Sequence, residues 1–232
     1  MRIGTDSIEF GTADTSFDGN TSSVTPRIIV TGTDTGIGKT VFAAGLVRLL
    51  DGCYWKPVQA GLEGESDSAV VRRLSGLQPE RILPEAWALR TPASPHLAAE
   101  RDAVQIDVAA LTPPAVDRPL VIEGAGGLMV PVTRKVLLID VFAQWRAPVV
   151  LCARTGLGTL NHTLLSLEAL RHRDIRVMGI ALIGDAHVDN ERTLVEFGGV
   201  PVLGRLPRLA RLTSRTLERA FGAAFSRESF LG

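Results

Sequence analysis

The segment 32–40, Gly-Thr-Asp-Thr-Gly-Ile-Gly-Lys-Thr, contains the residue types best suited to holding phosphate. Backbone N–H groups of a glycine-rich loop and of the following helix point at the anion, a lysine adds positive charge, and a hydroxyl completes the shell of a magnesium ion. Lys39 and Thr40 would take the last two roles. Because Gly32 and Gly38 enclose one residue more than the common pattern, we interpret the segment as a variant phosphate-binding loop. The alternative is an ordinary strand-to-helix turn.

A second lysine, Lys56, lies near the carboxyl end of an apolar run at 53–58, where Pro57 stiffens the backbone. Ligands of open α/β sheets bind at the carboxyl ends of the strands, so Lys56 is expected beside the loop. A cation there favours phosphoryl transfer, because it offsets charge that develops on the transferred group. The alternative is a surface lysine at a strand end.

Two acidic residues are candidate magnesium ligands. Glu123 closes the apolar run 120–123 and is followed by Gly-Ala-Gly-Gly, so its carboxylate is expected at the ligand-binding edge of the sheet. The alternative is a solvated acid at a turn. Asp67 stands where a helix begins, and on position alone a role in the first helical turn is equally well supported.

These side chains must be positioned by alternating strands and helices. Apolar runs predict strands at 27–31, 53–58, 120–123, 148–153, 177–183 and 202–205. Helical spacing of apolar residues predicts helices at 39–51, 67–74, 160–171, 191–197 and 213–225. Such alternation implies parallel pairing through right-handed crossovers. We therefore expect a doubly wound, mostly parallel α/β sheet of P-loop NTPase type, with helices on both faces.

Composition narrows the function classes. The 232 residues are 45% hydrophobic, which allows one α/β domain at 27–232, preceded by a disordered extension at 1–26 that is rich in Gly, Ser, Thr and Asp. Basic and acidic residues both total 25, so a small metabolite is favoured over nucleic acid or a membrane as the partner. Two cysteines without a Cys-x-x-Cys pair, and no apolar signal segment, predict a cytoplasmic protein.

The order of several short motifs resembles that of the dethiobiotin synthetases, the ATP-dependent cyclases of biotin synthesis. The resemblance runs from about 27 to 211. It rests on the loop 32–40, Lys56-Pro57-Val58, Ser66-Asp67, Ser94-Pro95-His96, Glu123-Gly124-Ala125-Gly126-Gly127 and Asn161-His162. Each motif is weak alone, but together in this order they are specific.

The resemblance implies a set of site residues. Thr40, Asp67 and Glu123 would surround Mg²⁺, and Lys39, Lys56 and Thr35 would act in catalysis. Nucleotide-binding residues would be Gly36, Ile37, Gly38, Lys39, Thr40, Val41, Asp67, Glu123, Gly124, Ala125, Gly126, Leu206, Pro207, Arg208 and Leu209. Substrate-binding residues would be Ala60, Gly158, Thr159, Leu160 and Asn161, the last four supplied by the partner subunit of a homodimer.

The resemblance also implies the reaction. An amine of 7,8-diaminononanoate and CO₂, drawn from bicarbonate, would form a carbamate. The γ-phosphoryl group of ATP, or of another nucleoside triphosphate, would convert the carbamate into a mixed anhydride. The second amine would then close the ring of dethiobiotin. Because carbamate and phosphate are both anionic, two lysines and Mg²⁺ would offset their repulsion and stabilise the charge in transfer.

Three departures from the family pattern keep other functions open. Gly36, Ala60 and Gly184 stand where well-known relatives carry Glu, Ser or Thr, and Asn. They favour relaxed base selectivity or, as an alternative function, an inactive nucleotide-binding relative. A regulatory or partitioning ATPase is a further alternative, although Asp34 stands where that class usually carries a lysine. A glutamine-dependent ligase lacks support, because neither cysteine lies on a suitable turn.

Overall fold

A computed structural model describes residues 25–231 of the chain. The strands of its main sheet are β1 (Arg27–Gly32), β2 (Cys53–Trp55), β4 (Ile82–Leu83), β6 (Leu120–Glu123), β7 (Val149–Arg154), β8 (Val177–Ile183) and β9 (Val202–Leu206). They follow the order β4-β2-β6-β1-β7-β8-β9, and every neighbouring pair is parallel. A second, two-stranded parallel sheet pairs β3 (Val58–Ala60) with β5 (Trp87–Leu89). The parallel sheet predicted from the alternating pattern is thus confirmed.

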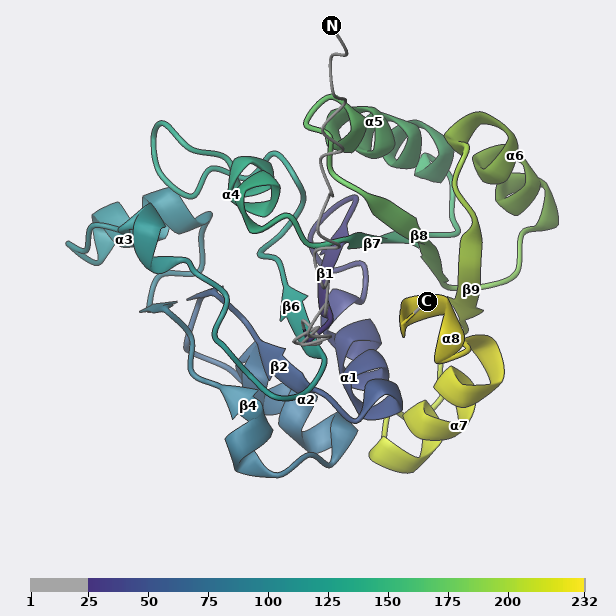
Figure 1. The fold of residues 1–232 in the computed structure, drawn as a ribbon, viewed down its shortest axis with the longest axis horizontal. Helices are drawn as coiled ribbons and strands as arrows, with labels where there is room; N and C mark the ends of the chain where they lie inside the picture. Colours follow the sequence, from purple (N-terminus) through teal and green to yellow (C-terminus); the bar gives the residue numbers. More distant parts are fainter. Residues whose placement is uncertain (1–24, 232) are drawn as a thin grey trace, which may run out of the picture.

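Helices cover both faces of the main sheet (Figure 1). They are α1 (Lys39–Leu50), α2 (Asp67–Ser75), α3 (Pro95–Arg101), α4 (Leu138–Trp145), α5 (Thr159–Arg171), α6 (Val188–Gly198), α7 (Ser214–Ala224) and α8 (Glu228–Leu231). Single 3₁₀ turns occur at Pro79–Arg81 and Val108–Ala110. In the view of Figure 1, α5 and α6 lie above the sheet, whereas α1, α2 and α7 lie below it. The doubly wound architecture is therefore confirmed, although the pattern did not predict α3, α4 or α8.

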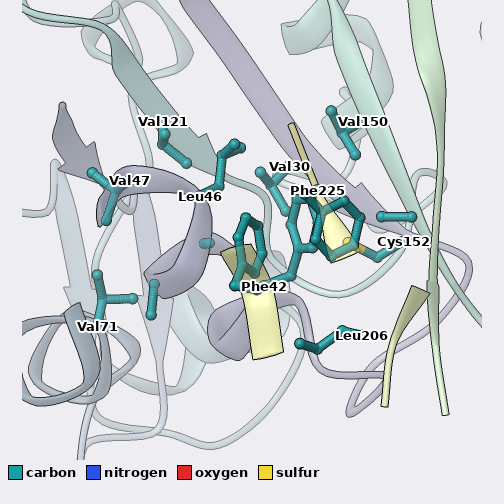
Figure 2. Close-up of a cluster of buried hydrophobic side chains, with 14 of the residues drawn as sticks. Val30, Phe42, Leu46, Val47, Val71, Val121, Val150, Cys152, Leu206 and Phe225 are labelled. Carbon is teal, nitrogen blue, oxygen red and sulfur yellow. The ribbon is translucent and has the colours of Figure 1, made fainter. Parts of the chain in front are cut away.

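The core below the sheet is built around α1. Phe42 is fully buried and packs against Phe225, with 5.3 Å between the ring centroids (Figure 2). The ring of Phe221 lies at the same distance from that of Phe42. Gly45, one turn later on the same helix, leaves the space that Phe221 fills, because a Cβ atom there would lie 2.1 Å from the Phe221 ring. This packing fixes α1, and with it the loop that precedes it, against the sheet.

The single strand predicted at 53–58 is wrong. The chain forms β2, leaves the main sheet at Lys56 and Pro57, and then forms β3 in the second sheet. Proline has no N–H with which to continue a ladder of hydrogen bonds, which explains the break. As a result Lys56 lies between the two sheets, where its side chain is 4% exposed.

The register of the strands brings the predicted site residues to one edge. Val30 in β1 aligns with Glu123 in β6, and Trp55 in β2 aligns with Ile122. The carboxyl ends of β1, β6 and β2 therefore lie side by side, and the phosphate-binding loop, Glu123 and Lys56 follow from them. This edge is where ligands of doubly wound sheets bind.

The described part of the chain contains no helix that is both long and apolar enough to span a bilayer. The extension predicted at 1–26 lies, apart from Thr25 and Pro26, outside the described residues. Pro26 extends the pairing of β1 with β6 at the amino ends of these strands, since its carbonyl accepts a hydrogen bond of 2.8 Å from the N–H of Leu120.

Candidate active site

The loop between β1 and α1 has the backbone conformation of an anion cradle. Gly36 and Gly38 adopt positive φ angles of 70° and 104°, which favour glycine because it lacks a Cβ atom. Gly38 is the residue that precedes α1, so no side chain caps the helix at this position. The first N–H groups of α1 are thereby left to a ligand, at the positive end of the helix dipole.

Lys39 folds back over this loop. Its Nζ donates a hydrogen bond of 2.7 Å to the carbonyl oxygen of Asp34. The Asp34 carboxylate is itself held, because it accepts from the N–H of Thr35 at 2.7 Å and pairs with Arg154 at 3.2 Å. Burial, followed by the neighbouring Lys56 ammonium, lowers the pKa of Lys39. The loop thus presents a lysine whose ammonium form is disfavoured by burial, and a bound anion would stabilise that form.

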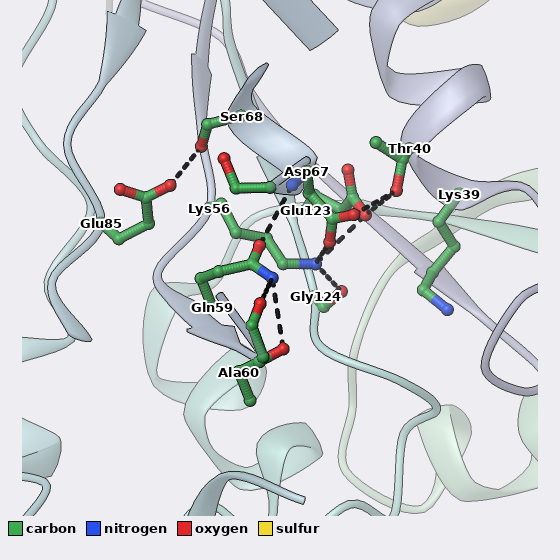
Figure 3. A network of polar contacts seen from close by, with 12 residues as sticks. Lys39, Thr40, Lys56, Gln59, Ala60, Asp67, Ser68, Glu85, Glu123 and Gly124 are labelled. Carbon is green, nitrogen blue, oxygen red and sulfur yellow. Dashed lines mark hydrogen bonds and ion pairs between the residues drawn. The ribbon is translucent and has the colours of Figure 1, made fainter. Parts of the chain in front are cut away.

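Four side chains, from α1, α2, β6 and the link between β2 and β3, converge beside the loop (Figure 3). The hydroxyl Oγ1 of Thr40 lies 3.0 Å from Asp67 Oδ1 and 2.8 Å from Glu123 Oε1. The Nζ of Lys56 lies 2.6 Å from Asp67 Oδ2 and 3.1 Å from Glu123 Oε1. It also donates to the carbonyl oxygen of Gly124 at 3.1 Å. All four side chains were predicted for this site, and the fold brings them together.

The charged groups of this cluster shift one another's pKa values. Burial by itself lowers the pKa of Lys56, but Glu123 and then Asp67 outweigh it, so the pKa of Lys56 is raised. Burial likewise raises the pKa of Asp67, but the Lys56 ammonium, the Thr40 hydroxyl and the Lys39 ammonium together outweigh it and hold that pKa below its usual range. Lys56 is therefore a cation and Asp67 an anion at neutral pH.

Two residues that the sequence analysis missed contact Glu123 and Asp67. The hydroxyl of Tyr54 donates to Glu123 Oε2 at 2.8 Å, and the side-chain oxygen of Gln59 accepts from the backbone N–H of Asp67 at 3.2 Å. Burial, then Glu123, raises the pKa of Tyr54 well above its usual range, which keeps its proton available for donation. Tyr54 was detectable, because it precedes Lys56 by two positions and side chains two apart along a strand share a face.

The oxygen atoms of Thr40, Asp67 and Glu123 form a donor set that suits a hard divalent cation. No cluster of three His, Cys, Asp or Glu residues able to hold a metal occurs among the residues described. Phosphate oxygens and water are the ligands that usually complete the shell of magnesium beside a nucleotide.

Two cavities meet at Lys56. One, of about 440 Å³, follows the loop, and the other, of about 500 Å³, lies on the side of β3 and α3. Both are lined by Thr35, Lys56, Asp67 and Gly126. The larger cavity also contains the predicted residues Ala60 and Ala125, and the smaller one contains Val41.

A third cavity, of about 390 Å³, continues the loop toward β8 and β9. It is lined by Gly36, Ile37, Gly38, Arg154, Ile183, Gly184 and Arg208. Of the residues predicted at 206–209, Arg208 lines this cavity, whereas Leu206 is buried in the core. Arg154 was missed, although its place at the carboxyl end of β7 is the criterion that identified Lys56 and Glu123.

The segment predicted to anchor substrate at 158–161 lies at the start of α5. Gly158 has a φ of 88° and precedes the helix. Leu160 is partly exposed, and Asn161 is exposed. Thr159 is buried, and its hydroxyl donates to the carbonyl oxygen of Arg154. None of the four residues lines the 500 Å³ cavity of its own chain.

Comparison with known proteins identifies the relatives of this chain. A family model described as an AAA domain matches residues 26–216. The chain is 66% identical over 206 residues to an ATP-dependent dethiobiotin synthetase BioD of Rhodopseudomonas palustris (strain TIE-1), a match that covers 89% of this chain and 97% of that protein. It is 60% identical over 205 residues to the BioD of Agrobacterium fabrum (strain C58 / ATCC 33970), covering 88% of this chain and 97% of that protein.

Among solved structures, a ParA family ATPase from Chlorobium tepidum TLS superposes with a TM-score of 0.53 at 13% sequence identity. The match covers 86% of this chain and 98% of that chain. At this identity the similarity supports the fold alone.

Proposed function

Because this chain belongs to the dethiobiotin synthetase family, whose activity is the ATP-dependent formation of dethiobiotin, we propose that its two cavities divide the reaction between them. The 440 Å³ cavity takes the triphosphate, and the 500 Å³ cavity takes 7,8-diaminononanoate with CO₂. The observation that carries this assignment is the position of Lys56, which lines both cavities and bridges Asp67 and Glu123.

The proposed reaction has three steps. One amine of the substrate attacks CO₂, forming a C–N bond and losing a proton, to give a carbamate. A carbamate oxygen then attacks the γ-phosphorus of ATP, the bond to ADP breaks, and a carbamic-phosphoric mixed anhydride forms. The second amine attacks the carbonyl carbon, loses a proton and expels phosphate, which closes the cyclic urea. The protein has to bring anions together and hold the second amine near the carbonyl carbon.

Its own side chains fit these tasks. Lys39 exchanges the carbonyl of Asp34 for the phosphates, and its desolvated ammonium makes the exchange favourable. Lys56 stabilises charge on the oxygens that pass between carbamate and phosphate, and Thr35, which lines both cavities, orients the same group. Ala60 contributes an apolar wall to the diamine cavity where relatives with Ser or Thr add a hydroxyl.

Magnesium would be held by Thr40, Asp67 and Glu123 together with the phosphates, where it supplies neutralisation of the charge on the triphosphate. The nucleotide base would enter the 390 Å³ cavity, which offers Arg154, Arg208 and the backbone at Gly184. Gly184 has no side chain with which to select adenine, so ATP and other nucleoside triphosphates fit the site.

A homodimer is also part of the proposal. Leu157, Leu165 and Met129 are exposed, and Leu165 and Met129 line a hollow that reaches Thr35 at the loop. Exposed apolar side chains gathered beside a site favour a protein interface. A second copy seated here would bring residues 158–161, with the N–H groups that begin α5, toward the far carboxylate of the substrate.

The test is detection of dethiobiotin by mass spectrometry after the protein is mixed with 7,8-diaminononanoate, bicarbonate, Mg²⁺ and each nucleoside triphosphate in turn. We expect product with ATP, and product with other triphosphates at comparable concentrations. Nucleotide binding without product from any of them would contradict the proposed reaction and favour a regulatory ATPase or an inactive relative.

A further inference from the structure

Lys56 is held in place by two hydrogen bonds and an ion pair. Its ammonium donates to one oxygen of Glu123 and to the carbonyl of Gly124, both at 3.1 Å, and pairs with one oxygen of Asp67 at 2.6 Å. Its side chain is 4% exposed and that of Glu123 is 1% exposed. The ammonium thus acts as a built-in counter-ion for the buried carboxylate of Glu123 and the partly buried carboxylate of Asp67.

The same two carboxylates are the ones that the proposed function gives to magnesium. Glu123 Oε1 accepts from Lys56 and also contacts Thr40. A magnesium ion sits about 2.0–2.1 Å from its oxygen ligands, so an ion on this oxygen and an ammonium hydrogen-bonded to it would lie a few ångströms apart. Two cations at such a distance repel strongly in a site of low polarity. Lys56 and the metal are therefore competitors for one position.

The surroundings determine which group moves. Tyr54 holds the second oxygen of Glu123 at 2.8 Å, so this carboxylate stays where it is, and Gln59 anchors the backbone that carries Asp67 at 3.2 Å. Lys56 lies at the end of a flexible four-carbon stem, and it lines the 500 Å³ cavity as well as the loop cavity. The 500 Å³ cavity offers space for the ammonium on the substrate side.

We propose that the Lys56 ammonium leaves Asp67 and Glu123 when a divalent cation binds them, and enters the 500 Å³ cavity. The lysine that stabilises the carbamate is then delivered to the substrate only after the metal has bound. Without the metal, Lys56 keeps the carboxylates neutralised and is withheld from the substrate. This inference rests on the proposed magnesium site.

Chemical labelling of the wild-type protein tests the displacement directly. The chain contains three lysines, Lys39, Lys56 and Lys135, and Lys135 is exposed. Acetylation by acetic anhydride, read at each lysine by mass spectrometry, is compared with and without Mn²⁺ in the absence of nucleotide. We expect the labelling of Lys56, relative to that of Lys135, to rise severalfold when Mn²⁺ is added.

Metal binding without nucleotide provides a second measurement, made by electron paramagnetic resonance of free Mn²⁺. Lys56→Met removes the competitor, so we expect it to bind Mn²⁺ about tenfold more tightly than the wild type. Lys39→Met is the matched control for charge, because Lys39 is a neighbouring cation that contacts Asp34 and not the carboxylates. An equal gain in both variants would show a general effect of charge and would overturn the displacement.

Glu123→Gln separates this inference from the function on which it rests. Suppose that Glu123→Gln weakens Mn²⁺ binding, but that Lys56 of the wild type stays protected from acetylation when Mn²⁺ binds. The displacement is then wrong, and the metal site stands. If Glu123→Gln leaves Mn²⁺ binding unchanged, the metal site itself is wrong, and the displacement with it.

Discussion

The ammonium of Lys39 donates to the carbonyl oxygen of Asp34, five positions earlier in the same loop, at 2.7 Å. The loop therefore supplies its lysine with a neutral partner that a phosphate, being charged, readily replaces. Lys39 points away from the pair of carboxylates that engages Lys56 (Figure 3). The two lysines of the site thus have separate partners and, we expect, separable effects.

Removal of the Lys39 charge is expected to weaken nucleotide binding and turnover. Lys39→Met removes a cation that would stabilise charge on the transferred phosphoryl group. Removal of one such stabilising side chain typically lowers kcat by about 10²–10³. Calorimetric titration with a non-hydrolysable ATP analogue and the dethiobiotin assay measure the two effects. Lys135→Met is the control, and full turnover by Lys39→Met would disprove the role of the loop.

Neutralising Glu123 is expected to raise the magnesium requirement. Glu123→Gln keeps the shape of the side chain but offers the metal a neutral amide oxygen in place of a carboxylate. The measurement is the Mg²⁺ concentration at half-maximal rate, at saturating ATP. We expect this concentration to increase, and an unchanged value would remove Glu123 from the metal site.

Loss of the Tyr54 hydroxyl is expected to affect both stability and metal binding. Tyr54→Phe leaves a buried carboxylate oxygen of Glu123 without its donor, which costs about 1–3 kcal/mol of unfolding free energy. Urea unfolding measures this loss. A freed Glu123 should also raise the magnesium requirement, and a variant that is less stable yet has the wild-type requirement would show that Tyr54 does not position the carboxylate.

The lowered pKa of Asp67 predicts a stability difference that depends on pH. A carboxyl group whose folded pKa lies below its unfolded value, about 3.9, stabilises the fold above that value, and the contribution is lost as the pH falls through the folded pKa. We therefore expect the wild type to be more stable than Asp67→Asn at neutral pH, with the difference shrinking below about pH 4. Urea midpoints across the acid range measure it, and a constant difference would contradict the ion pair with Lys56.

The packing of α1 is testable at Gly45. A methyl group there would lie 2.1 Å from the ring of Phe221, which is 1% exposed and cannot withdraw. Gly45→Ala is expected to cost about 1–3 kcal/mol of unfolding free energy through overpacking. Gly222→Ala is the matched control, since nothing lies within 4 Å of its added Cβ, and an alanine at this exposed position in α7 is expected to stabilise the helix slightly. Equal effects of the two changes would show that Phe221 can move aside.

Most of the fold could be predicted from the sequence, because its signals are local. Apolar periodicity marks strands and helices, and the glycines at 36 and 38 mark the positive φ angles of the loop. Short elements were missed, since α3 and α4 span 7 and 8 residues and offer few turns of periodicity. The break after β2 was missed although Pro57 is visible, because the pairing of β3 with β5 depends on a partner far along the chain.

The sequence by itself determined the phosphate-binding loop, the order of the elements and the family resemblance, since each depends on the identity and spacing of neighbouring residues. The tertiary structure alone decided the partners of the charged groups. Thr40 and Glu123 are 83 positions apart, and Lys56 and Glu123 are 67 apart, so their contact follows only from the register of β1, β6 and β2. Hydrogen bonds and ion pairs act over a few ångströms, and no local pattern encodes which distant residues the sheet will bring that close.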